Sequence, residues 1–383
     1  MKITIVLGAF LPVPTTMGGA VEKVWLNLAA EFVRRGHEVV MISRAMAQSP
    51  REQTVEGVRH RRVPGFDTPR SLLWLKFLDL IYSVRTLSLL PEADIVVTNT
   101  FWLPMLLRDP SRGRLYVHVA RFPKGQMRFY GRAARLQGPS TAVVRAIAAQ
   151  APALASKTAV VPNPAPASVA TSPPAALATR EKIILFVGRI HPEKGVHLLV
   201  AAFAAGARTV FADWRLMIVG PAEERLGGGG ESYLASLKKA AQTASTQVTF
   251  TGPIFDASEL ERRFRAARLF VYPSLAERGE SFGLAPLEGM THRCAVLVSN
   301  LECFADFVRE EETGFIFDHR TKDQAGALSE KMEKVLADDS LLGRVAEEGY
   351  RKSSEYSVSR VADRFLSDFH SVMQGSHVAS TSR

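Results

Sequence analysis

The stretch LFVGRIHPEKG, residues 185–195, is the strongest single indication of the fold class of this chain. It starts as a short apolar run typical of a buried strand, turns at a glycine, and continues through Pro192 into a helical pattern. Two cations, Arg189 and Lys194, flank the turn that leads into the helix. Backbone donors, the helix dipole and two positive charges directed at one point suit a bound diphosphate. We therefore predict an α/β unit with an anion site; ordinary surface cations near a turn are the alternative.

Short apolar runs alternate with helical patterns on both sides of this stretch. Most runs are continuous, as expected for parallel strands covered by helices on both faces. Strands are expected at residues 3–7, 39–42, 95–98, 115–119, 158–161, 183–187, 216–219, 248–251, 269–272 and 295–298. Helices are expected at 20–35, ended by Gly36, and at 360–373. The predicted fold class is α/β, with two successive doubly wound, Rossmann-like domains.

The two halves are separated by a stretch that cannot pack a core. Residues 163–174 have the sequence NPAPASVATSPP, a composition typical of a linker. The expected organisation is a first domain over 1–165, a linker over 166–180, a second domain over 181–358 and a C-terminal helix over 359–375. This last helix could pack back on the first domain. Ligands of such sheets bind beyond the carboxyl ends of the strands, so two domains facing one another would form a cleft.

Bulk composition limits the class of protein. The chain has 383 residues, of which 46% are hydrophobic and 22% charged, as expected for two globular domains. No apolar run reaches the roughly 18 residues that a spanning helix needs, and MKITIVLGAF lacks the features of a signal peptide. Cys294 and Cys303 provide neither a disulfide framework nor metal-ligand spacing, so both are expected in the core. A cytoplasmic location is predicted.

The chain has a net charge of +10, and one segment of it is notably basic. Five cations without an acidic residue are interleaved with apolar side chains there: Arg121, Lys124, Arg128, Arg132 and Arg135, with Phe122, Met127, Phe129 and Tyr130. The spacing from Lys124 onward is helical, which predicts that these cations share one face. A solvated helix surface and a surface for anionic lipid or a negatively charged acceptor both remain open. No nucleic-acid-binding motif accompanies the charge, so nucleic acid is not expected as a partner.

A second strand-to-helix transition lies in ERGESFGLAPLEGM, residues 277–290. Backbone amides at the helix start are expected from Ser281, Phe282, Gly283 and Leu284, with Pro286 in the first turn. Glu280 lies in the loop and Glu288 about a turn and a half into the helix, which favours adjacent roles on one ligand over a hydrolase pair. No Asp-x-Asp motif and no suitably spaced His or Cys favours a metal site, so neither a metal nor a cofactor is predicted.

In this order and spacing, GRIHPEKG followed by ESFGLAPLE resembles the signature of retaining family-4 glycosyltransferases of the GT-B fold, group 1, of the bacterial surface-glycan type. Further matches are MGGAVEK after the first strand, His118 after a later strand, VPNP at the start of the linker and FVYPS before the two glutamates. The resemblance covers nearly the whole chain. It implies that the first domain is the acceptor side and that the second binds a nucleotide diphosphate sugar.

The resemblance also implies a role for each marked residue. Glu288 would accept hydrogen bonds from ribose hydroxyls, Glu280 would lie beside the donor sugar, and Arg189 and Lys194 would neutralise the diphosphate leaving group. Donor and acceptor would lie near Gly18 and Gly19, although a plain loop before a helix explains these glycines equally well. The catalytic candidates are His118, Glu280, Arg189 and Lys194. The substrate-binding candidates are Gly18, Gly19, Arg189, Lys194, Glu280, Ser281, Phe282, Gly283, Leu284 and Glu288. On residues alone, His118 could instead be structural.

The helix-to-strand turn after Glu288 departs from the family pattern. Arg293 and Ala295 occupy positions where the family commonly has glycine and proline, so the helix-to-strand turn is expected to differ and Arg293 to alter the edge of the nucleotide pocket. The run LGGGGES, residues 226–232, matches neither a P-loop nor a dinucleotide fingerprint and is expected to be a flexible loop beside the cleft.

The predicted function is metal-independent transfer, with retention, of a hexose-type sugar from a nucleotide diphosphate sugar to a glycan or lipid-linked acceptor. The expected context is surface polysaccharide or lipopolysaccharide synthesis at the inner face of the membrane, with an anionic membrane surface as a partner of the basic segment. A GT-B-like nucleotide-sugar epimerase and a non-catalytic nucleotide-sugar-binding protein are the alternatives.

Overall fold

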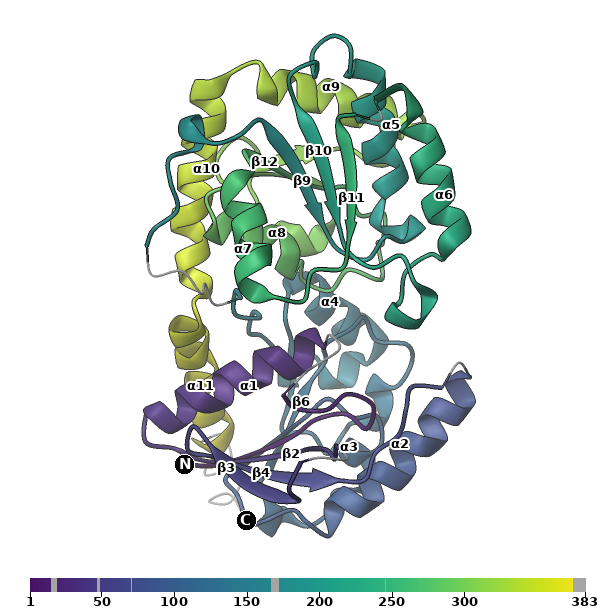
Figure 1. Cartoon of the computed structure of the whole chain (residues 1–383). Helices are drawn as coiled ribbons and strands as arrows, with labels where there is room; N and C mark the ends of the chain where they lie inside the picture. Colours follow the sequence, from purple (N-terminus) through teal and green to yellow (C-terminus); the bar gives the residue numbers. More distant parts are fainter. Residues whose placement is uncertain (15–18, 47–48, 70, 167–171, 245, 375–383) are drawn as a thin grey trace. The chain divides into compact units, whose positions relative to one another are not determined.

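The computed structural model describes residues 1–14, 19–46, 49–69, 71–166, 172–244 and 246–374. The chain forms two compact units: Met1–Pro164 with Val358–Arg383, called unit 1, and Ala165–Ser357, called unit 2. Each unit has a mainly parallel sheet with helices, which Figure 1 colours along the sequence. The predicted α/β class with two Rossmann-like domains is confirmed. None of the helices in the described ranges has the length and apolar character needed to cross a bilayer.

The sheet of unit 1 has the strand order β3-β4-β2-β1-β5-β6-β7-β8. Its strands are β1 (Lys2–Val6), β2 (Glu38–Arg44), β3 (Glu52–Val55), β4 (Val58–Val63), β5 (Ile95–Thr98), β6 (Arg114–His118), β7 (Arg135–Gly138) and β8 (Thr158–Val160). All neighbours are parallel except β3 and β4, which form an antiparallel hairpin. The residues of β3 are all exposed, so this strand lacks the apolar run by which the others are predicted.

The helices of unit 1 are α1 (Ala20–Arg34), α2 (Leu72–Leu87), α3 (Leu103–Leu106), α4 (Thr141–Gln150) and α11 (Val358–Gln374). α1 agrees with the predicted helix and buries Trp25, Leu28 and Phe32 on one face. It ends before Gly36, whose φ of 84° is the left-handed conformation expected of a helix terminator.

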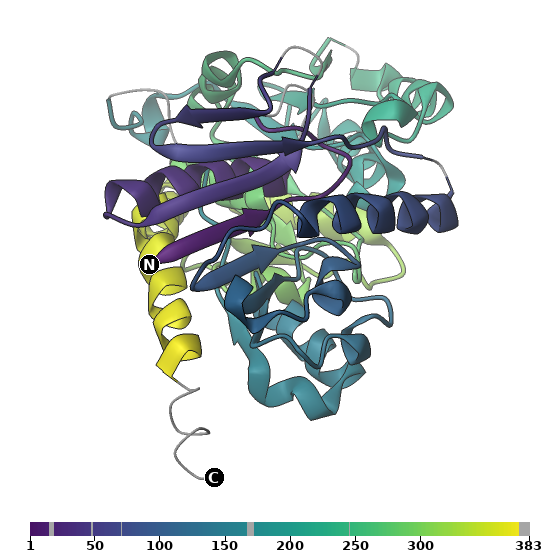
Figure 2. The ribbon, with the colours of Figure 1, turned by 90° about the horizontal axis from the view of Figure 1, so that it is seen from below.

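The last helix, α11, packs against α1, and Figure 2 shows the two side by side. Phe365 and Phe369 are fully buried, and the ring of Phe369 lies 4.9 Å from that of Tyr116. Arg35 at the end of α1 pairs with Asp363 and donates to the Ser359 carbonyl oxygen at 2.7 Å. The final turns of the chain's described part therefore complete the core of unit 1.

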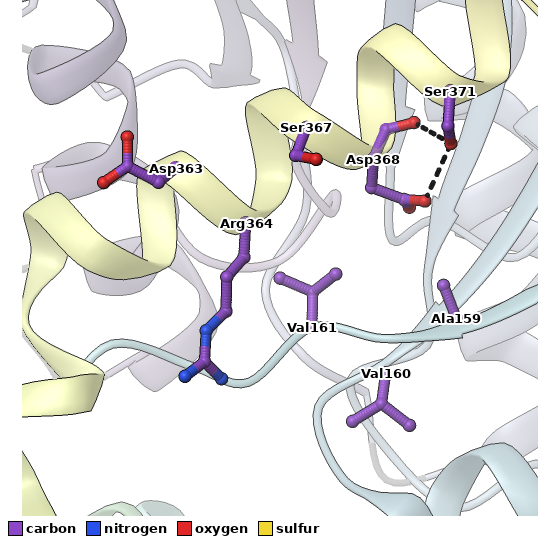
Figure 3. Close-up of a pocket in the computed structure, with 8 residues that line it drawn as sticks. All are labelled: Ala159, Val160, Val161, Asp363, Arg364, Ser367, Asp368 and Ser371. Carbon is purple, nitrogen blue, oxygen red and sulfur yellow. Dashed lines mark hydrogen bonds between the residues drawn. The ribbon is translucent and has the colours of Figure 1, made fainter.

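A hollow of about 460 Å³ lies between β8 and α11 (Figure 3). It is lined by Ala159, Val160, Val161, Asp363, Arg364, Ser367, Asp368 and Ser371. The Asp368 carboxylate accepts from the Tyr116 hydroxyl at 2.8 Å and pairs with Arg135 at 2.7 Å. Because these bonds hold α11 to the sheet, we place the candidate functional site elsewhere.

Unit 2 has the strand order β11-β10-β9-β12-β13-β14, and all neighbours are parallel. Its strands are β9 (Ile183–Val187), β10 (Arg215–Val219), β11 (Val248–Gly252), β12 (Leu269–Tyr272), β13 (Ala295–Ser299) and β14 (Phe315–Phe317). Its helices are α5 (Val196–Gly206), α6 (Glu231–Ala240), α7 (Ala257–Ala266), α8 (Leu284–Thr291), α9 (Gln324–Leu336) and α10 (Asp339–Ser353). The order reverses between β9 and β12, which is the switch point where such sheets bind ligands. Cys294 and Cys303 are buried, as predicted.

The helix predicted from Lys124 onward is wrong. Gly125 has a φ of 100°, only a short 3-10 turn forms at Met127–Phe129, and β7 begins at Arg135. Tyr130 is buried and donates its hydroxyl to the Phe101 carbonyl oxygen at 2.9 Å. The cations of this segment therefore do not form one helical face.

Candidate functional site

The loops after β9 and β12 meet at the switch point of unit 2. Gly195, at the end of the first loop, has a φ of 67°, and a Cβ atom there would lie 1.9 Å from the Pro273 carbonyl oxygen. Only glycine allows this close approach of the two backbones. The contact brings residues 188–195 against the loop that follows β12.

Lys194 and Glu280 come together across these two loops. The Lys194 Nζ lies 2.6 Å from Glu280 Oε2, and the two side chains are only 9% and 12% exposed. The Tyr272 hydroxyl and the Ser274 hydroxyl donate to the same oxygen at 3.2 and 3.3 Å. In the described part of the chain, the hydrogen bonds to this carboxylate all reach Oε2, which leaves Oε1 as an acceptor for ligand hydroxyls.

A buried ion pair of this kind is poorly explained by stability alone. Removing two charges from water costs several kcal/mol per ion, and the attraction between them often does no more than offset that cost. The Lys194 ammonium has three N–H donors and uses one on Glu280, so further donors remain for an anion. Burial raises the pKa of Tyr272 well above its ordinary value, with the neighbouring Glu280 adding to the effect, so its hydroxyl stays protonated and remains a donor.

Arg189 lies in the loop after β9 but already has protein partners. Its Nη1 donates to the Gly227 carbonyl oxygen at 2.7 Å, and its Nη2 lies 2.6 Å from Glu193 Oε1. The side chain is 43% exposed, in contrast to Lys194. The structure therefore pairs Lys194 with Glu280 and holds Arg189 between a glycine carbonyl and a second carboxylate.

Two helix starts face this region without a side-chain cap. Gly195 precedes α5 and Gly283 precedes α8, both with left-handed backbones and neither with a capping side chain. A Cβ atom at Gly283 would lie 2.5 Å from the Phe304 ring. First-turn amides of helices favour anions, so Leu284 and its neighbours can offer backbone donors.

The remaining residues predicted on this loop take different positions. Phe282 is buried, with its ring 5.5 Å from that of Phe307, so its side chain belongs to the core and only its backbone can face a ligand. Ser281 precedes α8 and is half-buried. Glu288, also half-buried, lies in the second turn of α8. The ligand roles of Ser281, Leu284 and Glu288 stay predictions.

The glycine run at 227–230 differs from the flexible loop expected. Three of its backbone N–H groups donate to backbone carbonyl oxygens. The bonds are Gly228 to Glu223 at 2.9 Å, Gly229 to Ile190 at 2.8 Å and Gly230 to Ala222 at 2.8 Å. These bonds hold the run against the loop after β9, where Gly227 supplies the acceptor for Arg189.

The expected effect of Arg293 on the nucleotide pocket is also corrected. Arg293 has a φ of 55°, which is a left-handed conformation. Glycine adopts this conformation without strain, and the family commonly has glycine at this position. Its guanidinium lies 4.6 Å from the Tyr350 ring, pairs with Glu347 at 3.1 Å and donates to the Pro174 carbonyl at 2.9 Å. The turn between α8 and β13 lies at the amino ends of the strands, on the opposite edge from Lys194.

In unit 1, the predicted residues follow β1 and β6. Gly18 lies outside the described residues, and Gly19 precedes α1 with a φ of 103°. Glu22 in the first turn of α1 is buried, and burial raises the pKa of its carboxyl although Arg121 acts in the opposite direction. Glu22 was not among the residues predicted for the site.

His118 ends β6 and is buried beside Trp25, whose ring lies 5.4 Å away. Its Nδ1 lies 2.5 Å from Gln137 Oε1, and Gln137 Nε2 donates to the Val161 carbonyl at 2.5 Å. Because the amide nitrogen is committed to that carbonyl, the amide oxygen must be the acceptor and His118 Nδ1 the donor. Burial lowers the pKa of His118 to about 4, so the ring is neutral near pH 7 with its lone pair on Nε2.

Several residues that shape the site were missed from the sequence. Tyr272 and Ser274 hold Glu280, Glu193 pairs with Arg189, and Gln137 orients His118. The available signal was a polar side chain within or next to a buried strand, as for Gln137 in β7. Among the described residues, no group of three or more His, Cys, Asp or Glu side chains is placed to hold a metal ion.

Two glycosyltransferase family models match this chain in succession. The family model described as "Glycosyl transferases group 1" matches residues 170–352, and that described as "Glycosyl transferase 4-like domain" matches residues 19–164. A D-inositol 3-phosphate glycosyltransferase of Rhodococcus opacus is 32% identical over 50% of this chain and 41% of its own length. A phosphatidyl-myo-inositol mannosyltransferase of Mycobacterium tuberculosis is 30% identical over 50% of this chain and 47% of its own. The matches thus span less than half the length of these relatives.

Solved structures resemble the fold over nearly the whole chain. Sucrose-phosphate synthase from Thermosynechococcus elongatus has a TM-score of 0.79 at 19% identity, covering 98% of this chain and 100% of that one. Anabaena Alr3699/HepE, solved in complex with UDP and glucose, has a TM-score of 0.69 at 18% identity, covering 97% and 100%. At such identities these likenesses show the GT-B fold alone.

Proposed function

The chain belongs to the family-4, group 1 glycosyltransferases, and from that premise we propose that it transfers a hexose-type sugar from a nucleotide diphosphate sugar. The single observation that supports this most is the buried pair of Lys194 and Glu280 at the switch point of unit 2. Lys194 lies on the loop that leads to the uncapped start of α5, and the amides of a helix start favour a diphosphate.

In the proposed reaction, charge grows on the diphosphate as the glycosidic bond breaks. Lys194 keeps its bond to Glu280 and uses its other N–H donors on the leaving group, so its contribution is greatest in the transition state. Glu280 Oε1 accepts a hydrogen bond from a hydroxyl of the donor sugar, and Glu288 accepts from the ribose. Arg189 contributes when a diphosphate competes with Glu193 for its guanidinium.

His118 acts on the acceptor side of the proposed reaction. Its neutral ring offers Nε2 as a hydrogen-bond acceptor for the attacking hydroxyl or for the donor sugar. The candidate residues include no nucleophile, which is consistent with retention by same-face attack in which the leaving phosphate takes up the proton. We propose that the transfer is independent of a metal ion.

The acceptor we propose is a glycan or lipid-linked molecule used in surface polysaccharide or lipopolysaccharide synthesis, at the cytoplasmic face of the inner membrane. By their names, the two relatives act on inositol phosphate and phosphatidylinositol, which makes an anionic polyol or lipid a second acceptor class to test. The exposed cations Arg128 and Arg132 suit such an acceptor, whereas Arg135 is paired with Asp368.

A thermal-shift screen with UDP, GDP and ADP sugars tests the donor, because a ligand that binds only the folded form raises the unfolding temperature. Transfer is then assayed with the stabilising donor, lipid-linked glycans and phosphatidylinositol. We expect Glu280→Gln to lower kcat by roughly 100-fold while the nucleotide still stabilises the protein. Stabilisation without transfer to any acceptor would indicate a binding protein, and a changed sugar without transfer would indicate an epimerase.

A further inference from the structure

α2 of unit 1 exposes apolar side chains while much of its buried face is polar. Its buried residues are Leu78 and four side chains with polar groups, Asp79, Tyr82, Ser83 and Thr86. Its exposed face contains Leu73, Trp74, Phe77 and Val84, which we call the outer stripe. Leu73 is 82% exposed and Phe77 is 47% exposed. An ordinary surface helix has the opposite arrangement, so the outer stripe calls for a partner.

The orientation of α2 is fixed by its polar face. Asp79 Oδ2 accepts the backbone N–H groups of Phe101 and Trp102 at 3.1 and 3.2 Å. The Trp102 indole N–H donates to the Lys76 carbonyl at 2.7 Å. Turning the apolar face inward would leave the Asp79 carboxylate without these bonds, so the stripe stays outside.

The edges of the outer stripe are positively charged. At 3.6 residues per turn, Lys76 lies roughly 100° to one side of Phe77 and Arg85 roughly 80° to the other. Both cations are exposed, and Asp79, the one acidic residue in this helix, is buried. The rings of Trp74 and Phe77 stack at 5.1 Å, which presents a flat aromatic surface between the cations.

We propose that the outer stripe of α2 inserts into the interfacial region of an anionic membrane. A helix of 16 residues with an apolar stripe, an exposed tryptophan and cations at both edges suits a position in the membrane plane, where the cations meet lipid phosphates. A second copy of the chain fits less well. If two such helices packed together, the positive charges of Lys76 and Arg85 on one helix would repel those on the other. α2 has no exposed acidic side chain that could pair with them.

The stripe also lies near the carboxyl edge of the unit 1 sheet. α2 follows β4 and precedes β5, so its first turns, with Leu73, Trp74 and Phe77, start at the edge where His118 ends β6. The Trp102 bond to Lys76 joins these turns to the loop after β5 at that edge. A lipid-linked acceptor held in the membrane would thus be presented on the side of the sheet that contains His118. This last step rests on the proposed function, whereas membrane binding does not.

The test measures co-sedimentation of the full chain with extruded vesicles of equal phosphatidylglycerol and phosphatidylcholine, and with phosphatidylcholine alone. We expect binding to the anionic vesicles to fall at least tenfold in Leu73→Glu/Phe77→Glu. Phe255→Glu is the matched control, because Phe255 is 65% exposed and lies in unit 2. Its binding should equal that of the wild type. Trp74 emission should shift to shorter wavelength on the anionic vesicles, and Trp74→Phe should abolish the shift.

Equal vesicle binding by the wild type and the stripe variant would overturn the proposal. So would a concentration-dependent dimer, seen by light scattering, that the stripe variant abolishes, because a second copy would then be the occupant. Thermal unfolding with the nucleotide chosen by the donor screen confirms that the stripe variant is folded. It also separates the two proposals: vesicle binding with no nucleotide stabilisation would contradict the proposed function and support the membrane surface.

Discussion

Gln137 matters to the candidate site because it determines which nitrogen of His118 holds the proton. Its amide joins the imidazole to the Val161 carbonyl, across three neighbouring strands. A buried, neutral histidine of fixed tautomer can accept a hydrogen bond through Nε2, which an imidazolium cannot do. Gln137 is therefore a positioning residue for the role proposed for His118.

Replacing Gln137 with glutamate should raise the pKa of His118 by at least about one unit above its value of about 4, because a carboxylate stabilises the imidazolium that it faces. Transfer should then lose rate as the pH falls through the new pKa, with kcat affected more than KM. The titration of the His118 ring proton by NMR checks the pKa, and Gln137→Leu serves as the control that removes the acceptor without adding charge. An unchanged His118 pKa in Gln137→Glu would contradict this account.

α2 shows how one buried carboxylate can orient a whole helix. Burial raises the pKa of Asp79 to about 6 from an ordinary value of 3.8, while the two backbone N–H groups act in the opposite direction. A carboxyl whose pKa is higher in the folded state binds more protons there. Its contribution to stability is therefore present at low pH and is lost as the pH rises through about 6.

Asp79→Asn should remove this pH dependence while keeping an oxygen for both N–H groups. The full effect of the shift is about 3 kcal/mol, of which roughly 1 to 2 kcal/mol falls between pH 5 and pH 7.5. We expect the free energy of unfolding of the variant, relative to the wild type, to rise by that amount over this range in urea titrations. A difference that stays constant with pH would mean that Asp79 does not titrate as described.

The elements predicted correctly and those missed have physical causes. Strands such as β5, β9 and β12 are continuous apolar runs, so their bounds follow from composition. β3 is exposed on both faces, and α2 buries polar side chains while exposing apolar ones, so neither shows the expected pattern. Lys194 and Glu280 could each be placed after a strand, but their contact depends on β9 lying next to β12, an order that the linear sequence does not state.

The chain as a whole consists of two units that each have their own core, with α11 returning to unit 1. The helix contributes Phe365 and Phe369 to a cluster with Trp25, Phe32 and Tyr116. The first part of unit 1 ends at Pro164, and unit 2 follows it in the sequence up to Ser357. The stability of unit 1 therefore depends on a helix that the chain reaches only after the whole of unit 2.

Phe369→Ala should destabilise unit 1 by roughly 3 to 5 kcal/mol, the usual cost of removing a fully buried phenylalanine ring. In differential scanning calorimetry, the transition of unit 1 should move down by roughly 10 °C and that of unit 2 should stay in place. Phe264→Ala, equally buried in unit 2, should show the reverse. One transition that both variants shift equally would show that the units unfold together.

The proposed function requires the diphosphate of the donor to bind beside Lys194. Isothermal titration calorimetry measures the affinities for the nucleoside diphosphate selected by the screen and for the matching nucleoside. The ratio of the two affinities is compared between the wild type, Lys194→Met and Lys194→Met/Glu280→Gln. The double variant avoids leaving the Glu280 carboxylate buried beside an apolar side chain. Lys182→Met is the control. Lys182 lies directly before β9, at the opposite end of the strand from Lys194, and pairs with Asp213. We predict that the preference for the diphosphate falls at least roughly 10-fold in both Lys194 variants and not in the control. A double variant that keeps the wild-type preference would show that Lys194 does not bind the diphosphate.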